Sequence, residues 1–89
     1  MSFAEVRIRN RLGLHARAAA KFVQLAHGFE ARVTVVRGHA RVNGKSILGL
    51  LTLAASQGTE LRLEAHGPDA GDAVRDLSAL VHGRFGEDE

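Results

Sequence analysis

Residues 4–26 read AEVRIRNRLGLHARAAAKFVQLA, and the spacing of their apolar positions changes at Gly13. Before the glycine, residues 4–9 alternate between apolar and charged side chains, which predicts a strand with one solvated face. After the glycine, apolar residues recur at helical spacing and predict a helix over residues 16–26 that stops at Gly28. The expected stripe comprises Ala16, Ala19, Ala20, Val23 and Ala26, with Phe22 widening it. A strand joined to an amphipathic helix through a glycine-containing loop is the unit from which this fold is built.

The rest of the chain continues to alternate strands with helices. The predicted elements are strands over residues 32–35, 39–43 and 60–66 and helices over residues 47–54 and 70–81. Gly38 marks a hairpin turn, and Asp69 is the expected N-cap of the last helix. Because the strands have one wet face and two of them form a hairpin, the sheet should be antiparallel and buried on one side. The order βαββαβα predicts an α+β fold in which three helices cover one face of a four-stranded antiparallel sheet.

Composition limits the class of protein. The 89 residues suit a single domain, residues 1–89, with an acidic tail at about 86–89 that we expect to fray. Without cysteine the chain has no disulfide framework and no thiolate chemistry, and no apolar run is long enough to span a membrane. The first residues lack the basic and apolar blocks of a signal peptide. We therefore expect a cytoplasmic protein without membrane insertion.

The loop after the first strand places His15 where the first helix should begin, with Arg17 two residues later. The first turn of a helix presents unpaired backbone N–H groups and the positive end of its dipole, which together bind anions. A histidine is disfavoured as a cation there, so its imidazole should stay neutral and nucleophilic. Arg17 can hold phosphate oxygens through its planar fork, beside a cradle of backbone amides from Ala16, Arg17 and Ala18. This arrangement predicts a histidine that accepts a phosphoryl group.

Charge is distributed unevenly along the chain. Residues 1–45 contain nine Lys/Arg and two Asp/Glu, whereas residues 46–89 contain three and eight. The basic residues expected on or beside segments near His15 are Arg7, Arg9, Arg11, Arg17, Lys21 and Lys45. Such a field attracts phosphate groups and acidic protein surfaces, although solvated strand and helix faces would give the same pattern.

The second predicted helix is apolar nearly all round. Its expected core stripe is Leu50, Leu53 and Ala54. The residues left partly exposed form what we call the docking patch: Ile47, Leu48 and Leu51. A contiguous exposed apolar patch on a small protein often marks a surface for a partner, unless loops cover it. Lys21 and Lys45 are the basic residues that we expect to assist docking.

Ser46 opens this helix and has two possible roles. Its hydroxyl can cap the first N–H groups of the helix. A phosphate on Ser46 would also suit the helix end and would place about two negative charges beside the docking patch.

Other functional classes find little support in the chain. The remaining histidines have no spacing that predicts a metal site, and no Ser, His and Asp are arranged as a catalytic set. Neither a cofactor nor a turnover enzyme is therefore expected. A small basic nucleic-acid-binding module would explain the N-terminal charge, but four phenylalanines without Tyr or Trp provide no stacking platform.

Two motifs resemble the HPr family of histidine phosphocarriers, which serve the bacterial phosphoenolpyruvate-dependent phosphotransferase system. Residues 11–23, RLGLHARAAAKFV, are similar to the family's active-site motif, and residues 43–55, NGKSILGLLTLAA, to its regulatory serine segment. Length and element order match over the whole chain. The resemblance implies an open-faced β-sandwich and a monomeric carrier of sugar transport.

The resemblance also implies partners and roles. His15 would accept a phosphoryl group on Nδ1 from phospho-enzyme I, with Arg17 steadying its oxygens, and pass it to a histidine of an enzyme IIA domain. HPr kinase/phosphorylase would phosphorylate Ser46, and a transcription factor would bind that form. A nitrogen-branch or purely regulatory HPr paralogue is the alternative within the family.

The chain departs from the family's motif at Ala18, where the family usually has proline. Proline suits the first turn of a helix because its missing N–H would have been unpaired anyway. Alanine returns one N–H donor and leaves the start of the helix less constrained. We expect phosphoryl transfer to survive, with an altered lifetime of the phosphohistidine.

Overall fold

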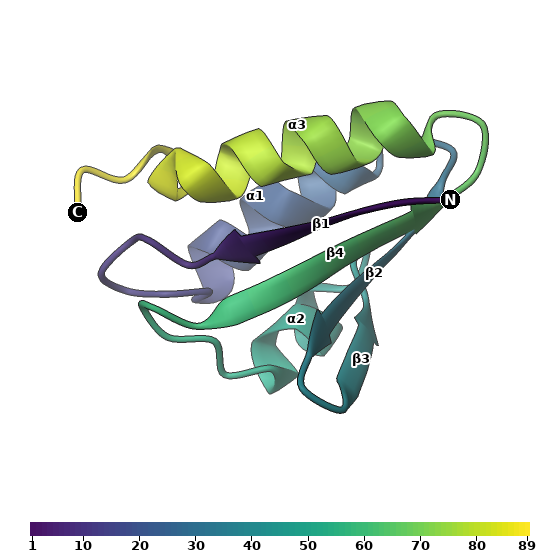
Figure 1. Ribbon diagram of the computed structural model, residues 1–89. Coiled ribbons are helices and arrows are strands. Elements are labelled where there is room, and N and C mark those ends of the chain that lie inside the picture. Colours follow the sequence, from purple (N-terminus) through teal and green to yellow (C-terminus); the bar gives the residue numbers. More distant parts are fainter.

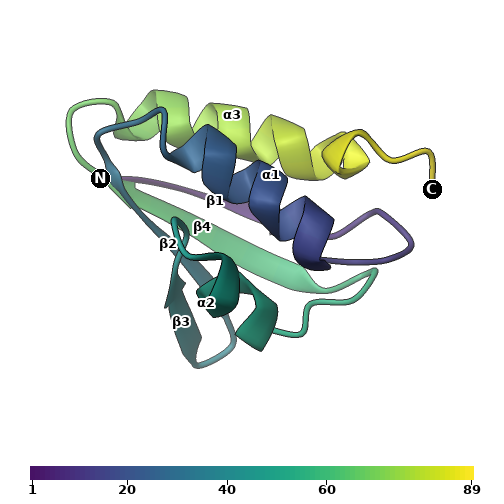
Figure 2. The same ribbon diagram turned by 180° about the vertical axis from the view of Figure 1, so that it is seen from behind.

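The structure is a computed structural model that describes residues 1–89. One antiparallel sheet lies against helices on a single side, so the other face of the sheet is open (Figures 1 and 2). The strands are β1 (Ser2–Arg7), β2 (Arg32–Arg37), β3 (Ala40–Asn43) and β4 (Glu60–His66). The helices are α1 (Ala16–Ala26), α2 (Ile47–Thr52) and α3 (Ala70–His82), followed by the 3₁₀ turn η1 (Arg84–Gly86). The predicted order βαββαβα and the open-faced α+β architecture are confirmed.

The sheet has the strand order β1-β4-β2-β3, and every pairing is antiparallel. Alternation along each strand sends one set of side chains to the helices, with Val6, Val35 and Leu63 almost wholly buried. These side chains meet the apolar stripes of α1 and α3 in one core cluster. No helix has both the length and the hydrophobicity needed to span a membrane.

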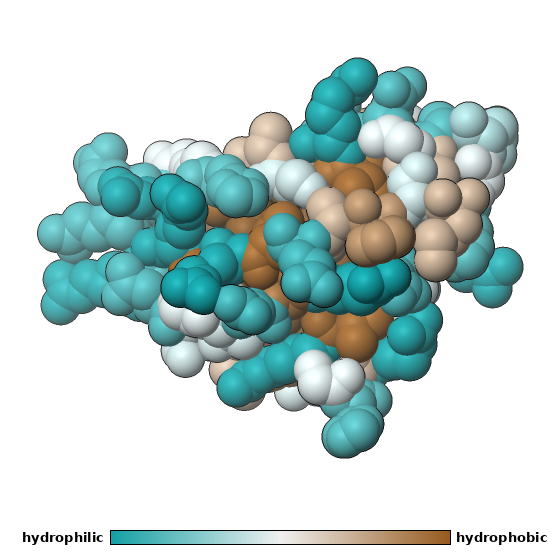
Figure 3. Space-filling model, viewed as in Figure 1, coloured by the Kyte–Doolittle hydropathy of each residue, from teal (hydrophilic) through white to brown (hydrophobic).

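The open face of the sheet is mainly polar, with some apolar surface between the charges (Figure 3). Arg62 lies with its guanidinium carbon 3.8 Å from the centre of the Phe3 ring. It also contacts Glu64, which Arg41 approaches at 2.6 Å from β3, across the intervening strand β2. These contacts cover part of the exposed Phe3 and keep the face compatible with water.

The helical stripes differ in detail from the prediction. In α1, Ala18 is buried and Ala16 is exposed, because the helix turns its first residue toward solvent at the loop. In α2, Leu50 and Leu53 are buried as expected, but Ala54 is exposed and Ala55 takes the core position. The helix ends at Thr52, and the left-handed backbone of Ala54 (φ 49°) rotates the next residue inward.

Asp69 does not act as the side-chain cap of α3. Its two carboxylate oxygens instead accept hydrogen bonds from the backbone N–H groups of Glu30 (2.9 Å) and Ala31 (2.8 Å). The start of α3 lies beside the α1–β2 loop, whose amide donors are nearer to the carboxylate than those of the helix. The hydrogen bond from Glu30, together with that from Ala31 and against the effect of burial, holds the pKa of Asp69 below its ordinary value.

The C-terminal segment is folded against the core where a frayed tail was expected. Phe85 is completely buried, although Arg84, Phe85 and Gly86 all have left-handed backbone angles. That conformation costs about 1–2 kcal/mol for each non-glycine residue, which burial of an aromatic side chain offsets. After this turn, the backbone N–H of Arg11 donates to the Glu89 carbonyl at 2.8 Å. The tail therefore lies along the β1–α1 loop.

Candidate functional site

The β1–α1 loop is held by the loop between α2 and β4. Gly13 has a left-handed backbone (φ 70°), and a Cβ at this position would lie 2.5 Å from the Ala55 carbonyl oxygen. The next residue, Leu14, is buried and donates its N–H to the same oxygen at 2.8 Å. Only glycine permits this close approach, and the contact places the following residue, His15, at the N-terminus of α1.

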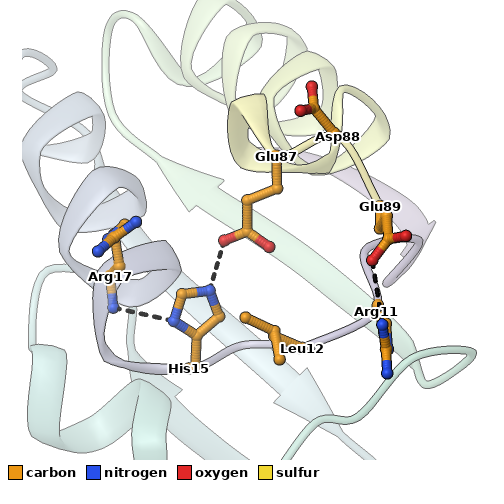
Figure 4. A pocket seen from close by; sticks show the side chains of 7 residues that line it. All are labelled: Arg11, Leu12, His15, Arg17, Glu87, Asp88 and Glu89. Atoms are coloured by element: carbon orange, nitrogen blue, oxygen red, sulfur yellow. Dashed lines mark hydrogen bonds and ion pairs between the residues drawn. The ribbon is translucent and has the colours of Figure 1, made fainter.

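His15 is the N-cap of α1, and its hydrogen bonds distinguish its two ring nitrogens. Nδ1 accepts from the backbone N–H of Arg17 at 3.3 Å and therefore carries no proton. The proton of the neutral ring is then on Nε2, which donates to a carboxylate oxygen of Glu87 (Figure 4). The lone pair of Nδ1 consequently points toward the helix N-terminus, where an incoming electrophile would meet backbone donors.

The first turn of α1 offers the donors that the sequence predicted. The backbone N–H groups of Ala16 and Ala18 make no hydrogen bond within the protein, and that of Arg17 contacts only His15. The Arg17 side chain is exposed and forms no ion pair. Three backbone donors and a guanidinium are thus gathered around one unprotonated nitrogen, which is the geometry of an oxyanion-binding site.

The site opens into a pocket of about 770 Å³ between the β1–α1 loop and the C-terminal tail (Figure 4). The lining residues are Arg11, Leu12, His15, Arg17, Glu87, Asp88 and Glu89. Neither the acidic tail nor the exposed Leu12 carries a sequence pattern that assigns it to the site. Of the six basic residues assigned to a field near His15, Arg11 and Arg17 line the pocket.

Glu87 is the most closely held of the tail carboxylates. One of its oxygens contacts His15, and the other accepts from the side-chain amide of Asn10 at 2.9 Å. Burial raises the pKa of the Glu87 carboxyl, but the hydrogen bonds from His15 and Asn10 and the nearby Lys21 hold it below its ordinary value. Glu87 is thus ionised at neutral pH while it faces the imidazole.

The docking patch is exposed as the sequence predicted. Leu48 is 77% exposed, and Ile47 and Leu51 are 40% and 37% exposed. These side chains belong to α2, which packs against α1, the helix that His15 caps. Leu12, 68% exposed in the pocket, adds an apolar side chain on the His15 loop.

The two lysines expected to assist docking serve contacts within the chain. Lys21 donates to the Phe85 carbonyl at 2.7 Å and so holds η1 on α1. Lys45 donates to the Phe29 carbonyl at 2.7 Å. Phe29 follows the C-terminal end of α1, whereas His15 is at the N-terminal end, about 16 Å away along an 11-residue helix. Lys45 therefore lies apart from His15.

Ser46 caps α2 through its side chain, as predicted. Its Oγ accepts from the backbone N–H of Gly49 at 3.0 Å, and its backbone N–H donates to the Asn43 carbonyl. The hydroxyl is therefore at the positive end of a short helix and directly adjacent to Ile47 of the docking patch.

Comparison with known proteins agrees with this geometry. A family model described as "PTS HPr component phosphorylation site" matches residues 3–82. The chain belongs to the HPr family. The phosphocarrier protein HPr of Neisseria meningitidis serogroup A is 51% identical over 84 residues, which cover 94% of each chain. The crystal structure of HPr-C-His from Thermoanaerobacter tengcongensis superimposes with a TM-score of 0.96, at 40% identity and with full coverage of both chains.

Other HPr relatives differ in name and in assembly. The phosphocarrier protein NPr of Shewanella violacea is 43% identical over 83 residues, covering 93% of this chain and 91% of its own. A structure described as an HPr dimer from T. tengcongensis has a TM-score of 0.78 and 41% identity, over 98% of this chain and 100% of that one. The HPr family thus includes phosphocarriers of two names and at least one dimeric form.

Proposed function

We propose that this chain is a cytoplasmic, monomeric phosphocarrier that accepts a phosphoryl group on Nδ1 of His15 from phospho-enzyme I. It then passes the group to a histidine of an enzyme IIA domain. The observation that carries this proposal is the unprotonated Nδ1 of His15, which faces the backbone donors of the first turn of α1. The protein holds the group and partners complete the reaction, so it acts as a carrier rather than as a turnover enzyme.

The role of the donors follows from the charge of the group transferred. The oxygens of a phosphoryl group on Nδ1 would accept a hydrogen bond from the Arg17 backbone N–H, which now contacts the ring. They would also accept from the free N–H groups of Ala16 and Ala18. The Arg17 guanidinium can move over the same oxygens because nothing restrains it. Phosphoryl transfer depends mainly on positioning and on stabilising spread charge, which these donors supply.

Partner docking is assigned to the exposed surface around the site. The docking patch and Leu12 provide apolar area, and Arg11 and Arg17 provide positive charge beside it. An acidic partner with an apolar groove would bury both kinds of group.

The decisive experiment is phosphorylation from phosphoenolpyruvate and enzyme I. We expect wild-type protein to acquire acid-labile phosphate and His15→Ala to acquire none. The matched control is His27→Ala, which removes an imidazole from the opposite end of α1. Absence of acid-labile phosphate on wild-type protein, with an enzyme I that loads another HPr, would refute the proposal.

We also propose that phosphorylation of Ser46 by an HPr kinase inhibits acceptance from enzyme I and creates a surface for a transcription factor. Ser46→Asp and Ser46→Asn test the charge, because both side chains can cap α2 and only one is negative. We expect Ser46→Asp to accept phosphate from enzyme I at least several-fold more slowly and Ser46→Asn to match wild type. Equal rates in the two variants would show that charge at this position does not regulate transfer.

A carrier of the nitrogen or regulatory branch is the second candidate, favoured by the likeness to an NPr. Sugar-branch and nitrogen-branch IIA domains, offered in the same reaction to protein phosphorylated on His15, would distinguish the two. Faster transfer to the sugar-branch domain supports the first proposal, and faster transfer to the other domain supports the second.

A further inference from the structure

The second ring nitrogen of His15, Nε2, forms a hydrogen bond with Glu87, which lies 72 positions later in the chain. Glu87 reaches the ring from the tail, and its carboxylate accepts from Nε2 (Figure 4). The His15 side chain is 27% exposed and that of Glu87 only 17%, although Glu87 follows the last helical turn of a small protein. A carboxylate in such contact with an imidazole controls which nitrogen carries the proton.

The position of Glu87 is enforced by a buried side chain. Asn10 is completely buried, and its Nδ2 donates to the Gly13 carbonyl at 2.8 Å and to Glu87 at 2.9 Å. Both hydrogens of the amide are thereby used, which fixes its orientation. Asn10 thus connects the loop that carries His15 to the carboxylate that contacts the ring.

The backbone on both sides of Glu87 is anchored as well. Before it, buried Phe85 holds η1 in the core, and Lys21 donates to the Phe85 carbonyl. After it, Glu89 accepts from the backbone N–H of Arg11. A solvated acidic side chain in a loose tail would have neither a buried amide bound to it nor an anchored backbone on both sides. The surroundings of Glu87 therefore fix its position.

We propose that Glu87 is a positioning residue for phosphoryl transfer at His15 and that Asn10 holds it in place. The proposal rests on the proposed function of His15 as acceptor. Glu87 keeps the proton on Nε2, so that Nδ1 always presents its lone pair to the phosphoryl donor.

Neither the transfer of the phosphoryl group to His15 nor its transfer to the next acceptor moves a proton. The Nδ1 lone pair forms the N–P bond as the bond from phosphorus to the donor breaks, and the donor keeps that electron pair. The ring retains its Nε2 proton and becomes a phosphoimidazolium, whose positive charge faces the Glu87 carboxylate. When the group leaves, the N–P electron pair returns to Nδ1 and restores the neutral ring. Glu87 thus stabilises the ring charge that makes the phosphoryl group transferable.

The matched variants are Glu87→Ala and Glu30→Ala. Each removes one glutamate carboxylate, but Glu30 is exposed in the α1–β2 loop and does not contact His15. The first readout is the proton NMR spectrum. Wild type and Glu30→Ala should show a downfield Nε2–H resonance of His15, protected from exchange, that Glu87→Ala loses while keeping the dispersed amide spectrum of a folded protein.

The second readout is the rate of phosphorylation by enzyme I. We expect Glu87→Ala to be phosphorylated about ten-fold more slowly, which is at the lower end of the effect of removing a hydrogen-bond partner of a functional imidazole. Glu30→Ala should match wild type. Absence of this resonance in wild type would show that Nε2 of His15 does not form the hydrogen bond with Glu87. A resonance present only with Glu87, but equal rates in both variants, would overturn the positioning role and leave the carrier function intact. Failure of wild type to accept phosphate would refute the carrier function, whereas the NMR comparison would still report on the contact.

Discussion

His15 serves two structural purposes with one ring. It caps α1 through Nδ1 and contacts the C-terminal tail through Nε2. A phosphoryl group on Nδ1 would replace the first of these contacts, because the Arg17 N–H would turn to a phosphoryl oxygen. Under the proposed function, the capping of α1 and the loading of the carrier would use the same backbone donor.

At the residue scale, Ala18→Pro tests the departure from the HPr motif. The Ala18 N–H has no partner within the protein, so proline removes no existing hydrogen bond. We expect the free energy of unfolding to rise by about 0.4–1 kcal/mol, because proline restricts the unfolded chain. The loss of one cradle donor should shorten the lifetime of the phosphohistidine while loading from enzyme I persists. Urea denaturation and the decay of acid-labile phosphate measure the two effects.

An Ala18→Pro protein with unchanged stability and unchanged phosphate decay would show that this N–H contributes nothing to the cradle. Because Ala18 is completely buried, its replacement also requires room for the proline ring. A stability below that of wild type would indicate that this room is lacking.

Single residues show where sequence reasoning succeeds and fails. His15 and Ser46 were placed correctly because capping is a local event, decided by donors two or three residues away. Asp69 was misplaced because its carboxylate prefers amides 38 and 39 residues distant, brought near only by the fold. Asn10 gave no signal, since a polar residue in a loop is usually exposed.

At the scale of elements, the short helix α2 carries the exposed docking patch on one side and the buried Leu50 on the other. Leu48→Ser should change the free energy of unfolding by less than about 0.5 kcal/mol, because the side chain is already 77% exposed. It should slow transfer from enzyme I about five-fold or more, as loss of about 1 kcal/mol of interface energy would. Initial transfer rates at low protein concentration are the appropriate measurement.

The control for Leu48→Ser is Phe3→Ser, which removes exposed apolar surface from the open face of the sheet. It should leave transfer unchanged. If both variants slow transfer equally, the effect does not come from the docking patch.

The turn η1 provides a second test at this scale. Phe85→Ala should lower the free energy of unfolding by about 3–5 kcal/mol, because the ring is completely buried in the main core. Equilibrium urea denaturation measures this loss. A decrease below about 1 kcal/mol would show that the tail is not anchored by this ring.

The major elements could be predicted because each has one apolar face, so alternation or helical spacing is visible in the sequence. The turn η1 could not, since one phenylalanine among Gly and charged residues has no period to detect. The contact of Glu87 with His15 was missed for the same reason: the acidic tail looked like a solvated terminus. Only the anchor at Phe85 brings that tail to the site.

At the scale of the whole molecule, distant segments are joined by ionised carboxylates. Asp69 and Glu64 both have a pKa below the ordinary value when folded, Asp69 through backbone amides and Glu64 through its hydrogen bond from Arg41 against the effect of burial. The unfolded chain therefore binds more protons as the pH falls, and stability present above the unfolded pKa is lost in acid, from about pH 5 downward.

Asp69→Asn should reduce this acid sensitivity. We expect the variant to be less stable than wild type at pH 7. The difference should narrow as the pH falls below the ordinary pKa of an aspartate, because the unfolded wild type then gains a proton that folded Asp69, with its lowered pKa, still excludes. Asp88→Asn is the control, because Asp88 is exposed and its carboxylate forms no hydrogen bond or ion pair. Urea midpoints at pH 7, 5 and 3 test the expectation, and parallel pH profiles for wild type and Asp69→Asn would contradict it.

The packed tail also bears on how the protein is best handled in the laboratory. The two ends of the chain lie at opposite ends of the molecule, and Glu89 is next to Arg11 at the rim of the His15 pocket (Figure 1). An affinity tag or fluorescent fusion joined after residue 89 would begin within this pocket and compete with incoming proteins. The same tag placed before Met1 would begin at the far end of the sheet and leave the pocket accessible.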